Sequence, residues 1–190
     1  LGLMNSIMIE EESKIEATYK VIMTLVAVIS LLSSVIIVIY NMLFSVINLN
    51  NLFLFFIIFI TIFTTQQIEI NYTWLNRKGE YNVLMKNPII NNSVYGIVSI
   101  LLGLLGKTEY GYYFGQILGR LITLMHMKRN LPSGLFTLNI ADFKYCFVTN
   151  SKFIKFQMPT NVITNFKNQL PTLLIKGFWD IKILGYYSIT

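Results

Sequence analysis

Residues that form covalent cross-links and metal sites are almost absent from this chain. Its 190 residues include one cysteine, Cys146, and one histidine, His126. A single cysteine excludes an internal disulfide, and we find no metal-ligand cluster, no Cys/His pair and no glycine-rich phosphate loop. Hydrolytic or transfer chemistry therefore has little support, and we predict neither a metal nor a cofactor. We expect Cys146 to be an inert small hydrophobic residue and His126 to lie at a helix end.

Charge is also scarce. Charged residues make up 13% of the chain and hydrophobic residues 54%, whereas about a quarter of a soluble domain is charged. The mean hydropathy is +0.59. So few charges cannot cover a globule of this size, and the composition predicts an integral membrane protein. The fold class we predict is all-α, a polytopic membrane helix bundle.

Long apolar stretches recur along the chain, and about 20 such residues cross a bilayer core. A polar loop at Trp74–Lys86 separates the second stretch from the third, which we expect Pro88 to open. The chain begins with Leu1 and ends at Thr190 inside an apolar segment, so we expect a fragment of a longer membrane protein. The predicted spans are about 21–40, 52–71, 88–106, 110–127 and 156–177, with a truncated span from about 181.

Basic residues collect in alternate loops. The positive-inside rule places the loops richest in Lys and Arg in the cytoplasm, and only Lys107 falls on the opposite side. Because the basic residues adjoin membrane spans, orientation explains them and nucleic acid is a poor partner. The predicted cytoplasmic set is Lys14, Lys20, Arg77, Lys78, Lys86, Lys128, Arg129, Lys144, Lys152 and Lys155.

Arg120 is the sharpest single candidate because it lies inside the fourth predicted span. An arginine at that depth is costly unless it faces protein or a water-filled cavity. Gln116 and Thr123 share its helical face. Two interpretations stay open: a cation lining a pathway for an anionic substrate, or an arginine that reaches toward the cytoplasmic interface. A neighbouring stripe at four-residue spacing allows close helix contact: Gly111, Gly115 and Gly119.

The stretch 155–187 predicts a helix with one apolar face and one amide-rich face. Pro159 suits its first turn, and Pro171 should bend it. Lys167 lies on the amide-rich face, with Asn165 and Gln169 close by in sequence. That face would be costly against lipid, so we predict that it lines a hydrated cavity and looks across at Arg120.

Several motifs resemble one family. F-x-x-P-T-N-x₇-Q-L-P (Phe156–Pro171) followed by G-Y-Y-S (Gly185–Ser188) is similar to the bacterial polysaccharide-repeat-unit flippases of the multidrug/oligosaccharidyl-lipid/polysaccharide exporter superfamily. W-L-N-R-K (Trp74–Lys78) and the run Glu10–Glu12 resemble its cytoplasmic loops. The chain departs from the pattern at Gln157, where the family has proline, and in the charges of Lys176 and Asp180.

The resemblance implies a two-lobed, pseudo-symmetric transporter and not an enzyme. Residues 1–130 would belong to the N-terminal lobe, 131–155 to a cytoplasmic interlobe linker and 156–190 to the start of the C-terminal lobe. The implied activity moves undecaprenyl-pyrophosphate-linked oligosaccharide across the bacterial cytoplasmic membrane by alternating access, for O-antigen or capsule. Membrane lipids and other polysaccharide-assembly proteins are the further expected partners. The substrate-contact candidates are Arg120, Lys167, Gln116, Asn165 and Gln169.

Two alternatives stay open. A cation-coupled multidrug exporter of the same superfamily should carry an intramembrane carboxylate, for which Glu69 is the available residue. A membrane-embedded polysaccharide polymerase or transferase should show a large external loop, and the visible external loops are short.

Overall fold

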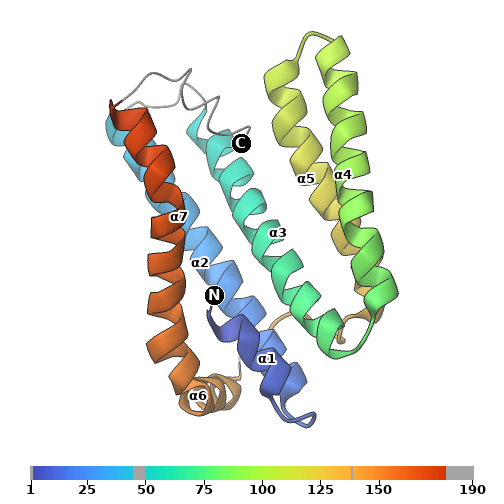
Figure 1. The fold of residues 1–190 in the computed structure, drawn as a ribbon, viewed down its shortest axis with the longest axis vertical. Coiled ribbons are helices and arrows are strands. Elements are labelled where there is room, and N and C mark those ends of the chain that lie inside the picture. The colour runs from blue at the N-terminus through green and yellow to red at the C-terminus, as the bar shows by residue number, and fades with distance from the viewer. Residues whose placement is uncertain (1, 45–49, 138, 179–190) are drawn as a thin grey trace.

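A computed structural model describes residues 2–44, 50–137 and 139–178, and within them the chain is all-α, with no strand (Figure 1). The predicted span from about 181 and the motif at 185–188 lie outside the described residues. This architecture confirms the predicted class, an all-α membrane helix bundle. The helices are α1 (Ser6–Ile9), α2 (Ile15–Phe44), α3 (Asn51–Arg77), α4 (Tyr81–Leu104), α5 (Thr108–Met127), α6 (Ile140–Thr149) and α7 (Met158–Phe178), with short helical turns η1 (Gly2–Asn5), η2 (Lys128–Asn130) and η3 (Phe153–Gln157).

Three of the described helices, α2, α3 and α4, are long enough and apolar enough to cross a membrane. Lipid offers no hydrogen-bond partners, so a spanning segment must satisfy its backbone internally, which a helix does. The amide of Asn50 caps α3 by accepting from the N–H of Leu52 at 2.9 Å. α5 and α7 have 20 and 21 residues and carry more polar side chains along their length.

Glycines close the turns before and after α4. Gly79 and Gly106 adopt φ of 72° and 73°, a left-handed conformation that glycine adopts without strain. In each turn, the residue after the glycine donates its N–H to the carbonyl of the residue five positions earlier. Glu80 donates to Leu75 in the first turn, and Lys107 donates to Leu102 in the second. The predicted loop Trp74–Lys86 is therefore too long, because α3 continues to Arg77 and α4 begins at Tyr81. Only residues 78–80 connect the two helices.

Pro88 lies inside α4 rather than opening it. A proline has no N–H, so the carbonyl one turn earlier lacks its usual helical donor. α4 nevertheless begins at Tyr81, where the glycine turn has already reversed the chain. The hairpin geometry, and not the proline, fixes where this helix starts.

The buried core lies at one end of the bundle, where α1, α2 and α3 meet. Tyr19 is at its centre, with its ring edge-on to Trp74 at 5.2 Å and its hydroxyl donating to Asn71 Oδ1 at 2.7 Å. Toward the other end, α2 exposes side chains such as Ile36 and Leu43, as expected where lipid covers a helix. The fully buried core side chains include Ile7, Ile15, Ile22, Met23, Ile70, Leu75, Met127 and Cys146.

The long helices alternate in direction, so the connections fall at two ends (Figure 1). The α1–α2 and α3–α4 connections, η2 and α6 share the end that holds the core. The α4–α5 turn with Lys107 lies at the opposite end. The basic loops thus gather at one end, called here the basic end. The cytoplasmic location of this end stays a prediction from the positive-inside rule.

Candidate functional site

α4 and α5 pack closely along the glycine stripe of α5. An added Cβ at Gly111, Gly115 or Gly119 would come within 3.1, 2.7 or 2.6 Å of α4. The distances at Gly115 and Gly119 are shorter than real Cβ atoms show, and the distance at Gly111 is tighter than most of them show, so a side chain at any of the three positions would push the helices apart. The close helix contact predicted from the stripe is confirmed. The α4 residues that the stripe meets are Asn91, Tyr95, Ser99 and Leu102.

A polar pocket of about 220 Å³ opens beside this contact. The rings of Tyr95 and Tyr112 meet edge to face, with centroids 6.0 Å apart. Amide groups supply both donors and acceptors to the lining. Because the glycines bring the two backbones together, polar side chains from both helices reach one small volume. The lining residues are Asn91, Asn92, Tyr95, Tyr112, Gln116 and Arg120.

Arg120 is half-buried in this pocket and donates hydrogen bonds to two uncharged acceptors. Its Nη2 donates to Gln116 Oε1 at 3.3 Å, and its Nη1 donates to the carbonyl of Thr61 in α3 at 3.4 Å. Both bonds are long for N–H···O contacts. No ion pair to Arg120 is present among the side chains that the structure describes. Gln116 lies one turn farther from the basic end, so the guanidinium does not reach toward that interface.

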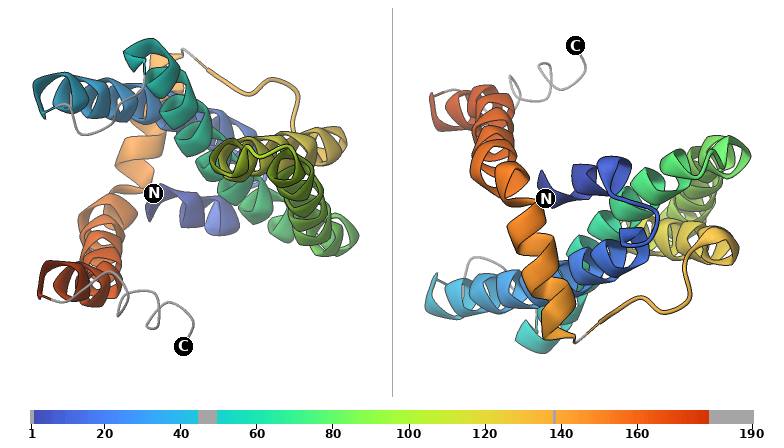
Figure 2. Two further views of the ribbon diagram at one scale, coloured as in Figure 1. Left: turned by 90° about the horizontal axis from the view of Figure 1, so that it is seen from above. Right: turned by 90° about the horizontal axis from the view of Figure 1, so that it is seen from below.

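The other predicted contacts separate into two groups. Thr123 is buried and donates to the carbonyl of Gly119 at 2.8 Å, so its hydroxyl is used within α5. Lys167, Asn165 and Gln169 are exposed on α7. α7 packs against η3 and η1 and is far from α4 and α5 in both views of Figure 2. The expectation that this amide-rich face looks across at Arg120 is therefore not met among the described residues.

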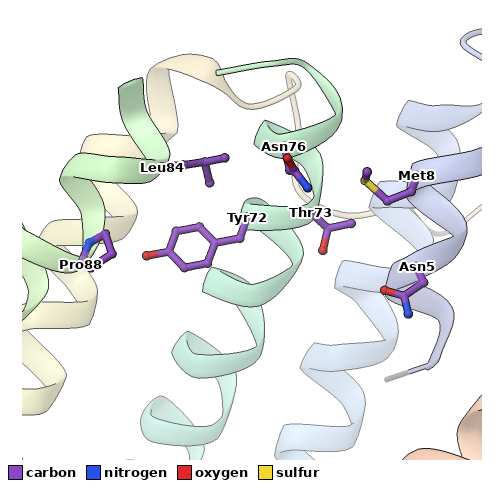
Figure 3. A pocket seen from close by; sticks show the side chains of 7 residues that line it. All are labelled: Asn5, Met8, Tyr72, Thr73, Asn76, Leu84 and Pro88. Carbon is purple, nitrogen blue, oxygen red and sulfur yellow. The ribbon is translucent and has the colours of Figure 1, made fainter. Parts of the chain in front are cut away.

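A second pocket, of about 380 Å³, lies between α1, α3 and α4 nearer the basic end. Figure 3 shows the ring of Tyr72 extending from α3 toward Pro88 of α4, with Asn76 and Thr73 on the same stretch of α3. None of its described lining residues carries a charge, so it offers hydrogen bonds but no ionic partner for an anion. The lining is Asn5, Met8, Tyr72, Thr73, Asn76, Leu84 and Pro88.

Comparison with known protein families places the chain in a family. The sequence fits the family described as polysaccharide biosynthesis protein over residues 1–190. The chain belongs to this polysaccharide biosynthesis family. No curated protein and no solved structure matches it. Membership gives the chain a role in polysaccharide biosynthesis, and the apolar helices make it a membrane protein of that family.

The sequence did not predict that Glu10 of this polysaccharide biosynthesis protein is a buried, hydrogen-bonded carboxylate. The carboxylate is 7% exposed and accepts from the hydroxyls of Tyr145 and Thr18 at 2.9 and 3.3 Å. Asn150 Nδ2 donates to it at 3.1 Å. Three neutral donors replace the water that the carboxylate loses on burial. Two of those donors lie more than a hundred residues away, so the local sequence carries no signal of the site.

Glu12 joins the same acidic run to the α3–α4 turn. Lys78 Nζ lies 2.8 Å from its carboxylate and Arg77 Nη2 lies 3.7 Å away. The hydrogen bond from Lys78, followed by the charge of Lys78, holds the pKa of the Glu12 carboxyl below its usual range. Arg77 Nη1 also donates to the carbonyl of Ile7 at 2.6 Å. The acidic run therefore ties the segment before α2 to the end of α3.

His126 has a structural partner in this family member. Its Nδ1 lies 2.8 Å from Oδ1 of Asn87, which joins α5 to α4. Glu69, the carboxylate required by the drug-exporter alternative, is exposed on α3 and does not line the polar pocket.

Proposed function

We propose that this chain is part of a flippase that moves undecaprenyl-pyrophosphate-linked oligosaccharide repeat units across the bacterial cytoplasmic membrane, for O-antigen or capsule synthesis, by alternating access. One observation carries the proposal: Arg120 sits in a polar pocket inside a membrane helix bundle, with neutral acceptors only. Membership of a polysaccharide biosynthesis family supports the sugar part of the substrate.

The chemistry of the pocket suits a pyrophosphate. A guanidinium presents several N–H donors in a planar fork that matches phosphate oxygens. The two neutral bonds that Arg120 now makes are long, so an anionic oxygen can replace them with a net gain. The absence of a carboxylate partner among the described side chains leaves the positive charge available to such a ligand.

The amides and phenols around Arg120 suit the sugar next to the phosphates. Asn91, Asn92 and Gln116 each offer a donor and an acceptor to a hydroxyl group, and Tyr95 and Tyr112 add aromatic surface. The volume of about 220 Å³ is below the roughly 300–1,000 Å³ of pockets that enclose whole drug-sized ligands. The pocket therefore accounts for the phosphates and the first sugar, and the rest of the repeat unit would lie beyond it.

Lys167, Asn165 and Gln169 remain candidates for a second contact surface in this proposal. They are exposed on α7, where a lysine among amides would meet the same kind of substrate. Their separation from Arg120 means that they would act on a different part of the substrate or at a different stage of transport.

The test replaces Arg120 with Ala and with Lys in the full-length protein. Loss of a hydrogen bond to a charged group costs about 1.5–3 kcal/mol, or roughly a 10- to 150-fold loss of transport at limiting substrate. We expect R120A to reduce surface polysaccharide while lipid-linked repeat units accumulate inside. R120K should rescue in part, since it keeps the charge and loses the fork. R129A, an exposed arginine outside the pocket, is the matched control.

Several outcomes would contradict the proposal. Wild-type export by R120A at equal membrane abundance would exclude Arg120 as a substrate contact. Ion-dependent efflux of drugs by the intact protein, with unchanged export, would support the drug-exporter alternative. Turnover of a lipid-linked substrate by purified protein in detergent would support the polymerase or transferase alternative.

A further inference from the structure

The outer face of α6 is both apolar and basic. Ile140 and Val148 are 82% and 67% exposed, and Phe147 is exposed beside them. Lys144, also exposed, lies between them, because residues 140, 144, 147 and 148 share one helical face. The exposed apolar side chains of this short helix therefore lie mostly on one side, and Lys144 lies among them.

Buried contacts fix which side of α6 faces outward. Cys146 is fully buried and lies on the face opposite to Lys144, and Asn150, the residue that caps the end of α6, is 3% exposed. The side chains of Tyr145 and Asn150 hydrogen-bond to the buried carboxylate of Glu10. These contacts set the rotation of the helix about its own axis, so the outer face cannot turn inward without breaking them.

α6 lies at the basic end and runs across the bundle rather than along it. Figure 1 shows it end-on beneath α7 and α2, and Figure 2 shows it from the side. Two more exposed lysines follow it in the chain, Lys152 and Lys155. Lys144, Lys152 and Lys155 make no ion pair among the described residues, and neither do Lys86, Lys128 and Arg129 at the same end. Lys20, Arg77 and Lys78 each pair with a glutamate.

We propose that the outer face of α6 lies in the headgroup region of the membrane leaflet at the basic end and binds anionic phospholipid. A helix with one lysine in a compact apolar face, followed by two more exposed lysines, is suited to that depth. Its apolar side chains enter the boundary between headgroups and acyl chains. The stems of Lys144, Lys152 and Lys155 would extend to the lipid phosphates, and each lysine near an anionic surface adds about fivefold to binding. The proposal does not depend on the transport function.

Hydrogen bonds and ion pairs link α6 to the other segments at the basic end. α6 holds Glu10 through Tyr145 and Asn150, and the neighbouring Glu12 holds Arg77 and Lys78. Anionic lipid bound by α6 would therefore steady the segment before α2 and the turn after α3. An anionic bilayer should stabilise the folded chain more than a neutral one does.

The first experiment measures depth. A Val148→Cys variant in a Cys146→Ala background carries an NBD fluorophore, with the full chain in nanodiscs. We expect blue-shifted emission that doxyl-labelled phosphatidylglycerol quenches more strongly than doxyl-labelled phosphatidylcholine. The matched site is Ser13→Cys, exposed on the acidic segment, which should emit as in water. Water-like emission at residue 148 would overturn the proposal. A blue shift that neither lipid quenches would also overturn it, because the fluorophore would then be covered by protein.

The second experiment keeps Cys146 and tests the charges. The melting temperature of the full chain is compared in nanodiscs of phosphatidylcholine with and without phosphatidylglycerol. We expect phosphatidylglycerol to raise it, and K144Q/K152Q/K155Q to abolish the rise. The control K86Q/K128Q/R129Q removes three exposed charges from the same end and should keep it. An equal loss in both triple variants, or no loss in the first, would refute a specific role for α6.

Discussion

Gly119 offers the sharpest test of the packing that builds the Arg120 pocket. The change is Gly119→Ala, which adds one Cβ to α5. That Cβ would lie 2.6 Å from Asn91 Oδ1 and 2.8 Å from the Asn91 carbonyl oxygen, where 3.4–4 Å is ordinary contact. The side-chain oxygen can rotate away, but the carbonyl belongs to the backbone of α4. The two helices must therefore separate by several tenths of an ångström.

The cost follows from this overlap. Overpacking of a well-filled contact costs about 1–3 kcal/mol, and replacing glycine by alanine inside a helix returns about 1 kcal/mol. Gly96→Ala in α4 isolates the second effect, because a Cβ there meets nothing within 4 Å. The difference in unfolding free energy between the two variants should therefore be about 1–3 kcal/mol, with G119A the less stable.

The assay is thermal unfolding of both variants in the same detergent or nanodisc. For a chain of this length each kcal/mol corresponds to about 2–4 °C, so G119A should melt roughly 2–12 °C below G96A. Because Asn91 also lines the pocket, G119A should reduce polysaccharide export more than its stability alone explains. Melting of G119A at or above the temperature of G96A would show that α4 and α5 do not pack as described.

Two further predictions concern the basic end. Burial raises the pKa of the Cys146 thiol to about 11 from its usual 9.0, so at pH 8 the folded chain should alkylate roughly a hundredfold more slowly than the denatured chain; equal rates would place Cys146 at the surface. Glu12, whose pKa is lowered chiefly by Lys78, contributes stability that is present above the unfolded pKa of about 4.5 and lost as pH falls through the lower folded value. E12Q should therefore melt below wild type at pH 7 and like wild type near pH 2, and a difference that persists in acid would assign the effect to packing instead.

Much of the fold is determined by the sequence alone. The apolar stretches at 21–40 and 52–71 lie within α2 and α3, because a segment that cannot bond to lipid must satisfy its own backbone. The glycine stripe predicted a close helix contact, and the four-residue spacing of Gln116 and Arg120 predicted their shared face. These inferences rest on local periodicity, which a sequence displays directly.

Only the tertiary structure shows which residues the glycine stripe, Arg120, Lys167 and Glu10 lie beside. The stripe meets Asn91, Tyr95 and Ser99 because the turn at Gly106 folds α5 back along α4, which makes the pocket polar. Arg120 reaches Thr61 from another helix, while α7 carries Lys167 to a different part of the bundle. Glu10 looks like one member of an exposed acidic run, yet it is buried by residues of α6. Contacts between residues so far apart in sequence depend on how helices are placed, and a helical pattern specifies a helix's faces but not its neighbours.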